Sequence, residues 1–439
     1  MPETLAAKAY DAIEHLIVEG SIPPGDLLSE VSLSQQIGIG RTPVREALQR
    51  LERDQLIVVE PRRGVRVTDI DRKRFEQAME VREALEPVMS RLAALSACRG
   101  QRLELRELAQ AMMEAADGGS SSGLLDVDFR FKRVVAEACG NPLLTTAIRP
   151  LHSVSRHFFF RHARTSQRSV ALAHAALMNL IASGDAAGAE AASERFLHSI
   201  RRFAKSVRAR RDAGPDQGSA QHRPDADMTL AGQAFRAIES LVVSQTYPPG
   251  EVLSELRLSA ELGIGRTPVR EALQRLSAFH LVTIQARRGA VVAELDRYDA
   301  STLNEARLPL EQLLSRLAAR RCTDRQRAEL KRLGVEWVRA AERGPTAEII
   351  AIDARMKSLV IAAAANPFLE RAIAPLHAMA RRSYFGRATI PDADVAAAQA
   401  ELLDRIAAGD ENAAALASVR FVAEAIRVVR GAMREPQPA

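Results

Sequence analysis

A fourteen-residue string, GIGRTPVREALQRL, occurs twice in this chain and constrains its architecture more than any other feature. It runs from Gly38 to Leu51 and again, unchanged, from Gly263 to Leu276, an offset of 225 residues (263 minus 38). The same offset relates three further motifs: Pro23-Pro24-Gly25 and Pro248-Pro249-Gly250, Arg62-Arg63-Gly64 and Arg287-Arg288-Gly289, Asn141-Pro142 and Asn366-Pro367. A period of this length indicates a fused duplication of one unit of roughly 200 residues, not a solenoid of short repeats.

The length and composition favour several helical domains. At 439 residues the chain is too long for a single core and suits about four domains of ordinary size, two in each copy. Aromatic residues make up 4% of the chain, whereas alanine, leucine and arginine are abundant, which favours packed amphipathic helices. The net charge of +6 is compatible with a nucleic-acid partner, although bulk charge alone is weak evidence.

Several protein classes are disfavoured. The three cysteines (Cys98, Cys139 and Cys322) form no CxxC pair and do not recur at the offset, so we expect reduced thiols and no disulfide or zinc–cysteine site. The chain has no apolar signal region and no run of eighteen apolar residues, which predicts a cytoplasmic protein without a membrane segment. The P-loop, G-x-S-x-G, H-E-x-x-H and Rossmann glycine motifs are absent, so we do not expect an enzyme.

The first 70 residues read as a winged helix-turn-helix. Apolar spacing predicts a helix over 4–19, which stops at Gly20, and Ser29 is suited to cap a second helix that ends at Gly38. A third helix is predicted to begin with Thr42 as N-cap and Pro43 in its first turn, and to run to about Arg53. Two short strands, 56–59 and 65–67, would then be joined by the Arg62-Arg63-Gly64 turn as a wing.

The remainder of each copy is predicted to be helical. Breaks at Gly100, 118–123, 140–142, Pro150 and 184–185 divide the segment after the wing into six or seven helices, an antiparallel bundle. A polar stretch over 212–228 is predicted to be a linker, whose seventeen residues span at most roughly 56 Å. The fold class is therefore mainly α, with two winged domains (1–70 and 229–295), each followed by a helical bundle (71–211 and 296–431).

The repeated string carries the residues expected to contact DNA. In a helix-turn-helix the N-terminal residues of the second helix face base edges in the major groove, and arginine makes bidentate contacts with guanine. The wing tip can reach phosphates or the minor groove. The predicted contacts are Arg41, Thr42, Arg45, Arg62, Arg63 and Gly64, with Arg266, Thr267, Arg270, Arg287, Arg288 and Gly289 in the second copy. The alternative is that these arginines are ordinary surface charges on a helical domain.

The pattern PPG-x-x-LSE-x-x-L-x-x-x-[IL]-GIGRTPVREAL-x-R-L followed by RRG resembles the GntR family of bacterial transcription regulators. The Arg82-x-x-Leu85-Glu86 and Gly140-Asn141-Pro142 motifs are similar to those of the FCD (FadR-like) effector-binding bundle. The resemblance covers nearly the whole chain, twice. It implies a repressor or activator that binds double-stranded DNA, usually as a dimer on a palindrome, and responds to a small carboxylic or sugar acid.

The tandem fusion departs from that family pattern. Two identical heads on one chain should read identical half-sites, so we expect an intramolecular pseudo-dimer, with a further homodimer left open. A metabolite-responsive repressor is the favoured function. An architectural DNA-binding protein, whose bundles bind no metabolite, is the alternative.

The resemblance also implies a divalent-metal site made by an Asp and three His, beginning with D-x-x-F-H. In the first copy the ligands left for such a site are Asp126, His174 and His198, with Arg130 in place of the first histidine. The second copy has Ala351, Gln399 and Ala423 at the corresponding positions, so a metal is expected in the first bundle or in neither.

Four polar positions recur in both bundles and are the predicted effector contacts. They are Arg82 and Arg307, Arg130 and Arg355, His152 and His377, and Arg156 and Arg381. One hypothesis is that the arginines replace the metal and bind an anionic effector directly, since guanidinium binds carboxylate bidentately. The other is that they form salt bridges with acids such as Glu86 or Glu311 inside the bundle.

Overall fold

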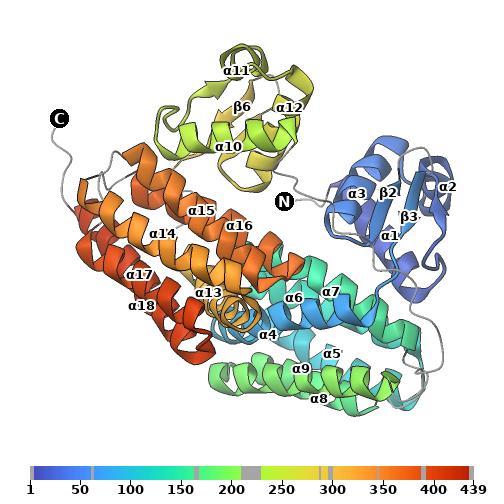
Figure 1. The fold of residues 1–439 in the computed structure, drawn as a ribbon. Coiled ribbons are helices and arrows are strands. Elements are labelled where there is room, and N and C mark those ends of the chain that lie inside the picture. Colours follow the sequence, from blue (N-terminus) through green and yellow to red (C-terminus); the bar gives the residue numbers. More distant parts are fainter. Residues whose placement is uncertain are drawn as a thin grey trace. The chain divides into compact units, whose positions relative to one another are not determined.

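Each half of the chain folds as a small winged head followed by a six-helix bundle. The computed structural model describes residues 4–60, 64–162, 168–208, 229–285, 288–294, 300–343, 346–386 and 392–434, and the predicted linker lies outside them. The chain divides into two units, Met1–Pro215 and Asp216–Ala439 (Figure 1). The predicted fold class, mainly α with a winged helix-turn-helix and a helical bundle in each copy, is confirmed.

The first head consists of three helices and a three-stranded antiparallel sheet. Ser29 caps the second helix as predicted, its hydroxyl accepting from the Ser32 amide at 3.5 Å, and Gly38 ends that helix at φ 67°. The strand order is β1-β3-β2, and the two-residue β1 was not predicted because so short a strand has no readable alternation. The elements are α1 (Leu5–Glu19), β1 (Leu27–Leu28), α2 (Glu30–Ile37), α3 (Arg41–Arg53), β2 (Ile57–Glu60) and β3 (Gly64–Val67).

The predicted start of the third helix was wrong by two residues. Gly40, not Thr42, is the N-cap of α3, and no side chain caps it. The Gly40 carbonyl accepts the first intrahelical bond, from the Val44 amide at 3.3 Å, and the amide groups of the first turn have no capping side chain. Arg41 and Thr42 consequently lie in the first turn of the helix, and both are exposed.

The second head repeats this arrangement with a different core pair. In the first head the Tyr10 hydroxyl donates to the Asp54 carboxylate at 2.7 Å, whereas Phe235 and Phe279 occupy these positions in the second, with ring centroids 5.1 Å apart. Burial raises the pKa of Asp54 from 3.8 to about 6. The elements are α10 (Leu230–Val243), β4 (Val252–Leu253), α11 (Glu255–Leu262), α12 (Arg266–Ala278), β5 (Val282–Gln285) and β6 (Gly289–Val292).

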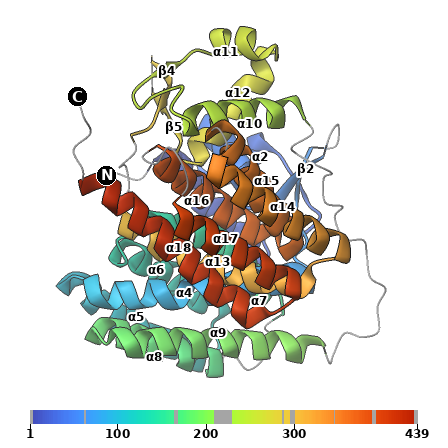
Figure 2. The same ribbon diagram turned by 60° about the vertical axis from the view of Figure 1, so that its left-hand side comes forward.

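Each bundle is built around one central helix. In the first bundle α4 packs against α6, α7, α8 and α9, and in the second α13 packs against α15, α16, α17 and α18. Figures 1 and 2 both show α17 and α18 side by side. The first bundle comprises α4 (Arg72–Ser96), α5 (Arg99–Asp117), α6 (Ser121–Ala138), α7 (Pro142–His162), α8 (Arg168–Ser183) and α9 (Ala186–Arg208). The second comprises α13 (Ala300–Arg321), α14 (Asp324–Arg343), α15 (Thr346–Ala364), α16 (Pro367–Phe385), α17 (Ala393–Ala408) and α18 (Glu411–Arg434).

The break predicted at Pro150 does not occur. Helix α7 runs through Pro150, and α16 likewise runs through Pro375. Proline removes one intrahelical hydrogen bond, and the buried residues on both sides of Pro150, such as Ile148 and Leu151, hold the helix in place. Among the described helices, none is long and apolar enough to cross a membrane.

The Asp54 carboxyl should make the first head less stable at neutral pH than in acid. Its folded-state pKa lies above the ordinary value, so the protonated form favours folding below about pH 4, and that contribution is lost as pH rises through about 6. The wild type should lose up to about 3 kcal/mol of head stability over this range, and Asp54→Asn should not. Amide hydrogen exchange of α1 and α3, corrected for the intrinsic exchange rate at each pH, measures the stability of the first head. The corresponding helices of the second head, α10 and α12, are the internal control. An equal pH dependence in the variant would contradict the assignment.

Candidate nucleic-acid interface and ligand pocket

The exposed start of α3 presents two arginines and a threonine on one surface. Arg41 and Thr42 occupy the first turn and Arg45 follows one turn later, all exposed. No acidic residue lies in this first turn, so its free amide groups and the helix dipole favour an anion such as phosphate. Arg266, Thr267 and Arg270 are equally exposed at the start of α12.

Arg45 is held in a fixed orientation by Glu30 of α2. Its Nε and Nη2 donate to the two Glu30 carboxylate oxygens at 2.9 and 2.8 Å, a bidentate pair. Arg270 and Glu255 repeat this geometry at 2.9 and 2.8 Å. Hydrogen bonding to the glutamate raises the pKa of each arginine. Neither glutamate was predicted from the sequence, although both belong to the LSE motif that recurs in the two copies.

The wing is described only in part. Arg62, Arg63 and Arg287 lie outside the described residues. Gly64 and Gly289 open β3 and β6 at φ 101° and 83°, a left-handed conformation that favours glycine. Arg288 is described and is exposed in the turn before Gly289.

A pocket of about 560 Å³, including the part open to solvent, lies inside the first bundle. All six helices contribute to its lining, which is apolar toward α5 and α9, whereas α8 contributes His174 beside Val170 and Ala171. Its polar wall comes from α4, α6 and α7. We use the name inner cluster for five residues that line the pocket together with Glu86, which three of them contact: Arg82, Asp128, Lys132, His152, Arg156 and Glu86.

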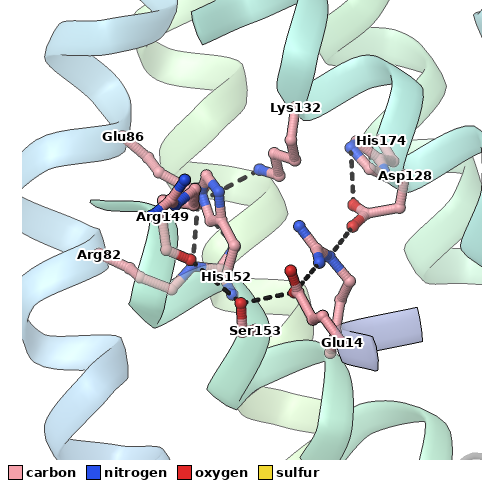
Figure 3. Close-up of polar contacts among 10 residues, drawn as sticks. Glu14, Arg82, Glu86, Asp128, Lys132, Arg149, His152, Ser153 and His174 are labelled. Carbon is pink, nitrogen blue, oxygen red and sulfur yellow. Dashed lines mark hydrogen bonds and ion pairs between the residues drawn. The ribbon is translucent and has the colours of Figure 1, made fainter. Parts of the chain in front are cut away.

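Glu86 is the centre of one half of the inner cluster. Its carboxylate accepts from Arg82 at 2.8 Å, from Lys132 at 3.2 Å and from His152 at 2.6 Å. Figure 3 shows Lys132 and His152 approaching Glu86 from α6 and α7. Burial would raise the pKa of Glu86, but the neighbouring cations hold it well below its usual range. Burial lowers the pKa of His152 to about 3, so this imidazole is neutral.

Arg156 is the centre of the other half and connects the pocket to the head. Its Nε donates to Asp128 at 2.7 Å, and its Nη1 donates to Glu14 of α1 at 2.5 Å. Glu14 also accepts from Ser153 at 2.5 Å and is buried (Figure 3). One buried guanidinium therefore bridges a pocket residue and the first helix of the winged head.

The second unit contains the same bridge. Arg381 donates to Asp353 at 2.9 Å and to Glu239 of α10 at 3.3 Å. His377 and Lys357 face Glu311 at 3.0 and 3.7 Å, with Arg307 at 2.9 Å. Of the predicted effector residues, the structure thus places Arg82, His152 and Arg156, with Arg307, His377 and Arg381, in buried ion-pair networks.

Arg130 and Arg355 do not belong to these networks. Their side chains are about half exposed and pair with Glu104 at 3.4 Å and Glu336 at 3.3 Å. The prediction was two residues out of register, and two residues rotate a side chain by about 200° around a helix. The residues that face inward are Asp128 and Lys132, with Asp353 and Lys357. Their recurrence at the 225-residue offset, four residues apart, was a signal that could have identified them.

The predicted metal ligands are not brought together. The Asp126 side chain is 65% exposed and His198 is exposed, so only His174 faces the pocket. His174 lies 3.8 Å from Asp128 and stacks on Phe196 at 4.2 Å. No group of three metal-ligating side chains occurs among the described residues. The inward residues do not fit a divalent ion, because Lys132 and Arg156 already supply the positive charge beside Asp128.

Comparison with family models assigns both domain types, twice. The model described as "Bacterial regulatory proteins, gntR family" matches residues 5–67 and 230–292. The FCD domain model matches residues 77–199 and 302–424. Within each family the two matches are 225 residues apart (230 minus 5 and 302 minus 77), the offset of the repeated string.

The following relatives each match less than half of this chain. An HTH-type transcriptional regulator of Agrobacterium vitis is 34% identical over 134 residues, 30% of this chain and 78% of that protein. The "Probable D-xylose utilization operon transcriptional repressor" of Paenarthrobacter nicotinovorans is 33% identical over 144 residues, 33% of this chain and 63% of its own length. The solved structure of McbR/YncC from Escherichia coli aligns with a TM-score of 0.42 at 20% identity, covering 47% of this chain and 99% of that structure.

The Glu14 carboxylate should secure the first head to its bundle. Glu14→Gln leaves Arg156 with one buried carboxylate instead of two, and losing one partner of a buried pair costs about 3 kcal/mol. Hydrogen exchange of α1 should accelerate accordingly. Glu239→Gln is the matched control with a smaller effect, since its bond to Arg381 is longer and Ala378 replaces Ser153. Unchanged protection of α1 in Glu14→Gln would disprove the role of this contact.

Proposed function

This chain belongs to the GntR family of DNA-binding bacterial regulatory proteins, with an FCD domain in each half, and we propose that it is a metabolite-responsive repressor. Its two heads act as a covalent pseudo-dimer on an operator with two half-sites, and a small carboxylic or sugar acid in the bundle controls their binding. The observation that carries the ligand response is the Arg156 bridge between the pocket and α1.

We assign recognition of the DNA sequence to the first two turns of α3 and of α12. Arg45 and Arg270 each project from the second turn of an exposed helix, and each is oriented by a bidentate glutamate. An arginine presented in this way can bind guanine through two hydrogen bonds, worth about 1–3 kcal/mol of discrimination. Arg41 and Arg266 in the first turn, beside free backbone amides, are suited to phosphate.

The pseudo-dimer follows from the identity of the two reading surfaces. Both heads carry the same fourteen residues, so both should prefer the same half-site. A covalent connection makes the second contact intramolecular and raises its effective concentration. Two similar half-sites, one or more helical turns apart, are therefore the expected operator.

The ligand response follows from competition for Arg156. A carboxylate that enters the pocket meets the Arg156 guanidinium, whose present partners are Asp128 and Glu14. Any ligand that draws Arg156 toward the pocket weakens its bond to Glu14 and changes how α1 is held. Ligand binding and the placement of the head are thereby coupled through one side chain.

Selection of bound duplexes from a random DNA pool at near-physiological salt tests this function. The wild type should enrich a motif with two similar half-sites. Arg45→Ala and Arg270→Ala should each lower affinity about 10–100-fold and relax one guanine position. Arg53→Ala is the control, because it removes the same charge from the far end of α3, where the second copy already has Ala278.

Non-specific binding in the same selection would contradict the proposed function. Binding to all sequences with a steep salt dependence, and equal losses in Arg45→Ala and Arg53→Ala, would contradict sequence-specific reading. That outcome would favour an architectural DNA-binding protein.

A further inference from the structure

An ammonium group is buried in each bundle, at a position that the DNA-reading role does not explain. The Lys132 side chain is 10% exposed, and its Nζ lies 3.2 Å from Glu86 and 5.4 Å from the centre of the Phe196 ring. Lysine is among the residues least often buried, because removing its charge from water is costly unless the charge is paired. A lysine held here therefore has a specific electrostatic role.

The second bundle retains this lysine while its surroundings differ. The Lys357 side chain is 9% exposed, 3.7 Å from Glu311 and 4.6 Å from the centre of the Phe421 ring. Across the pocket, however, His174 of the first bundle is replaced by Gln399. The cation is thus present in both copies, whereas the imidazole that could bind a metal is present in one.

The residues at positions 174 and 399 each have a polar atom without a hydrogen bond. Within the described residues, neither His174 Nε2 nor Gln399 Oε1 has a hydrogen-bond partner, and the two residues are 3% and 2% exposed. His174 lines the pocket, and its nearest charged neighbour is Asp128 at 3.8 Å. A buried polar atom without a partner costs free energy, so a ligand group that bonds to it would be favoured.

We propose that Lys132 and Lys357 are the built-in cations of two metal-independent ligand sites. Each ammonium supplies the positive charge that the family resemblance assigns to a divalent ion. The ligand is a small organic monoanion whose carboxylate accepts from the ammonium and whose hydroxyl group bonds to the free polar atom at position 174 or 399, because Gln399 Oε1 can only accept a hydrogen bond. The claim that these sites bind an organic anion rests on the proposed function, whereas the claim that they hold no metal does not.

The charges of the first bundle support this assignment. Arg82, Lys132 and Arg156 carry three positive charges, and the carboxylates that they contact, Glu14, Glu86 and Asp128, carry three negative charges. A divalent ion would add two positive charges to this balanced cluster, in which each of the three carboxylates already has a cationic partner. A monocarboxylate adds only one charge, and it can accept the remaining N–H donors of Lys132 and Arg156.

Restoring a metal site tests the proposal on the full-length chain. Lys132 lies one helical turn after Asp128, so Lys132→His places an imidazole beside Asp128 and His174. After dialysis against EDTA, calorimetry with Zn²⁺ should show no stoichiometric site in the wild type and one new site in Lys132→His, with a raised melting temperature. Lys357→His is the matched control. It faces Gln399 instead of a histidine, so its Zn²⁺ affinity should be at least about tenfold weaker.

Binding of the organic anion is tested separately, through the melting temperature. Gluconate at millimolar concentration, added with EDTA present, should raise the melting temperature of the wild type. The double variant Lys132→Gln, Lys357→Gln should lose this shift, and Arg130→Ala, Arg355→Ala should keep it because those arginines are outside the pocket.

Three results would overturn the proposal. The first is one tightly bound Zn²⁺ per wild-type chain. The second is a folded Lys132→His protein that binds no metal. The third is a gluconate shift that survives loss of both lysines. None of these measurements involves DNA, so failure of the DNA selection would disprove the proposed function and leave metal independence standing.

Discussion

The structure of each unit depends on one buried guanidinium. Arg156 cannot lose its charge, so two carboxylates must be buried with it, and these come from different domains: Asp128 from the bundle and Glu14 from the head. Separating the head from the bundle would leave unpaired charges in an apolar interior. The pairing of these buried charges therefore positions the head in addition to packing. Arg156 also lines the pocket. A ligand that moves Arg156 in the pocket therefore also changes the contact that holds α1.

The duplication provides a natural control for this interpretation. The Arg156 bridge, the central Glu86 and the buried Lys132 all have counterparts in the second unit, 225 residues later in the chain. The second unit replaces other polar groups with apolar ones: Tyr10 and Asp54 become Phe235 and Phe279, and Ser153 becomes Ala378. Met112, which lines the pocket of the first bundle, corresponds to Trp337 in the second bundle, and Trp337 is buried. The two bundles thus share a charge network but differ in the shape and polarity around it, so they need not bind the same ligand equally well.

The sequence was sufficient to predict the winged heads because their signals are local. Gly20, Ser29 and Gly38 each mark a helix end through their own backbone preference, and the structure uses all three. The start of α3 was misplaced by two residues because Thr42 is a residue type that favours the N-cap, whereas the N-cap is Gly40 and no side chain caps the helix. The wing arginines of the first head remain predictions, since they lie outside the described residues.

The interior of the bundle was harder to predict, again for a physical reason. Which face of α6 is inward depends on packing against α4, α5 and α7, and two residues of misregister put Arg130 inside in place of Lys132. Polar residues in a buried network look the same in sequence as polar residues on a solvated face. The copy-to-copy recurrence of Asp128, Lys132 and Glu14 was an available signal, but Arg130 recurs as Arg355 too, so recurrence alone does not separate the inward face of α6 from the outward one.

The central claim is that the pocket and the DNA-reading head are coupled through Arg156 and Glu14. Thermodynamic linkage requires a ligand that changes DNA affinity to have its own affinity changed by the same factor when DNA is bound. The most direct measurement is the gluconate affinity of the full chain, with and without saturating selected operator. We predict an affinity at least about fivefold different with DNA, a coupling of about 1 kcal/mol or more, and its loss in Glu14→Gln. Equal ligand affinities with and without operator in the wild type would contradict the account.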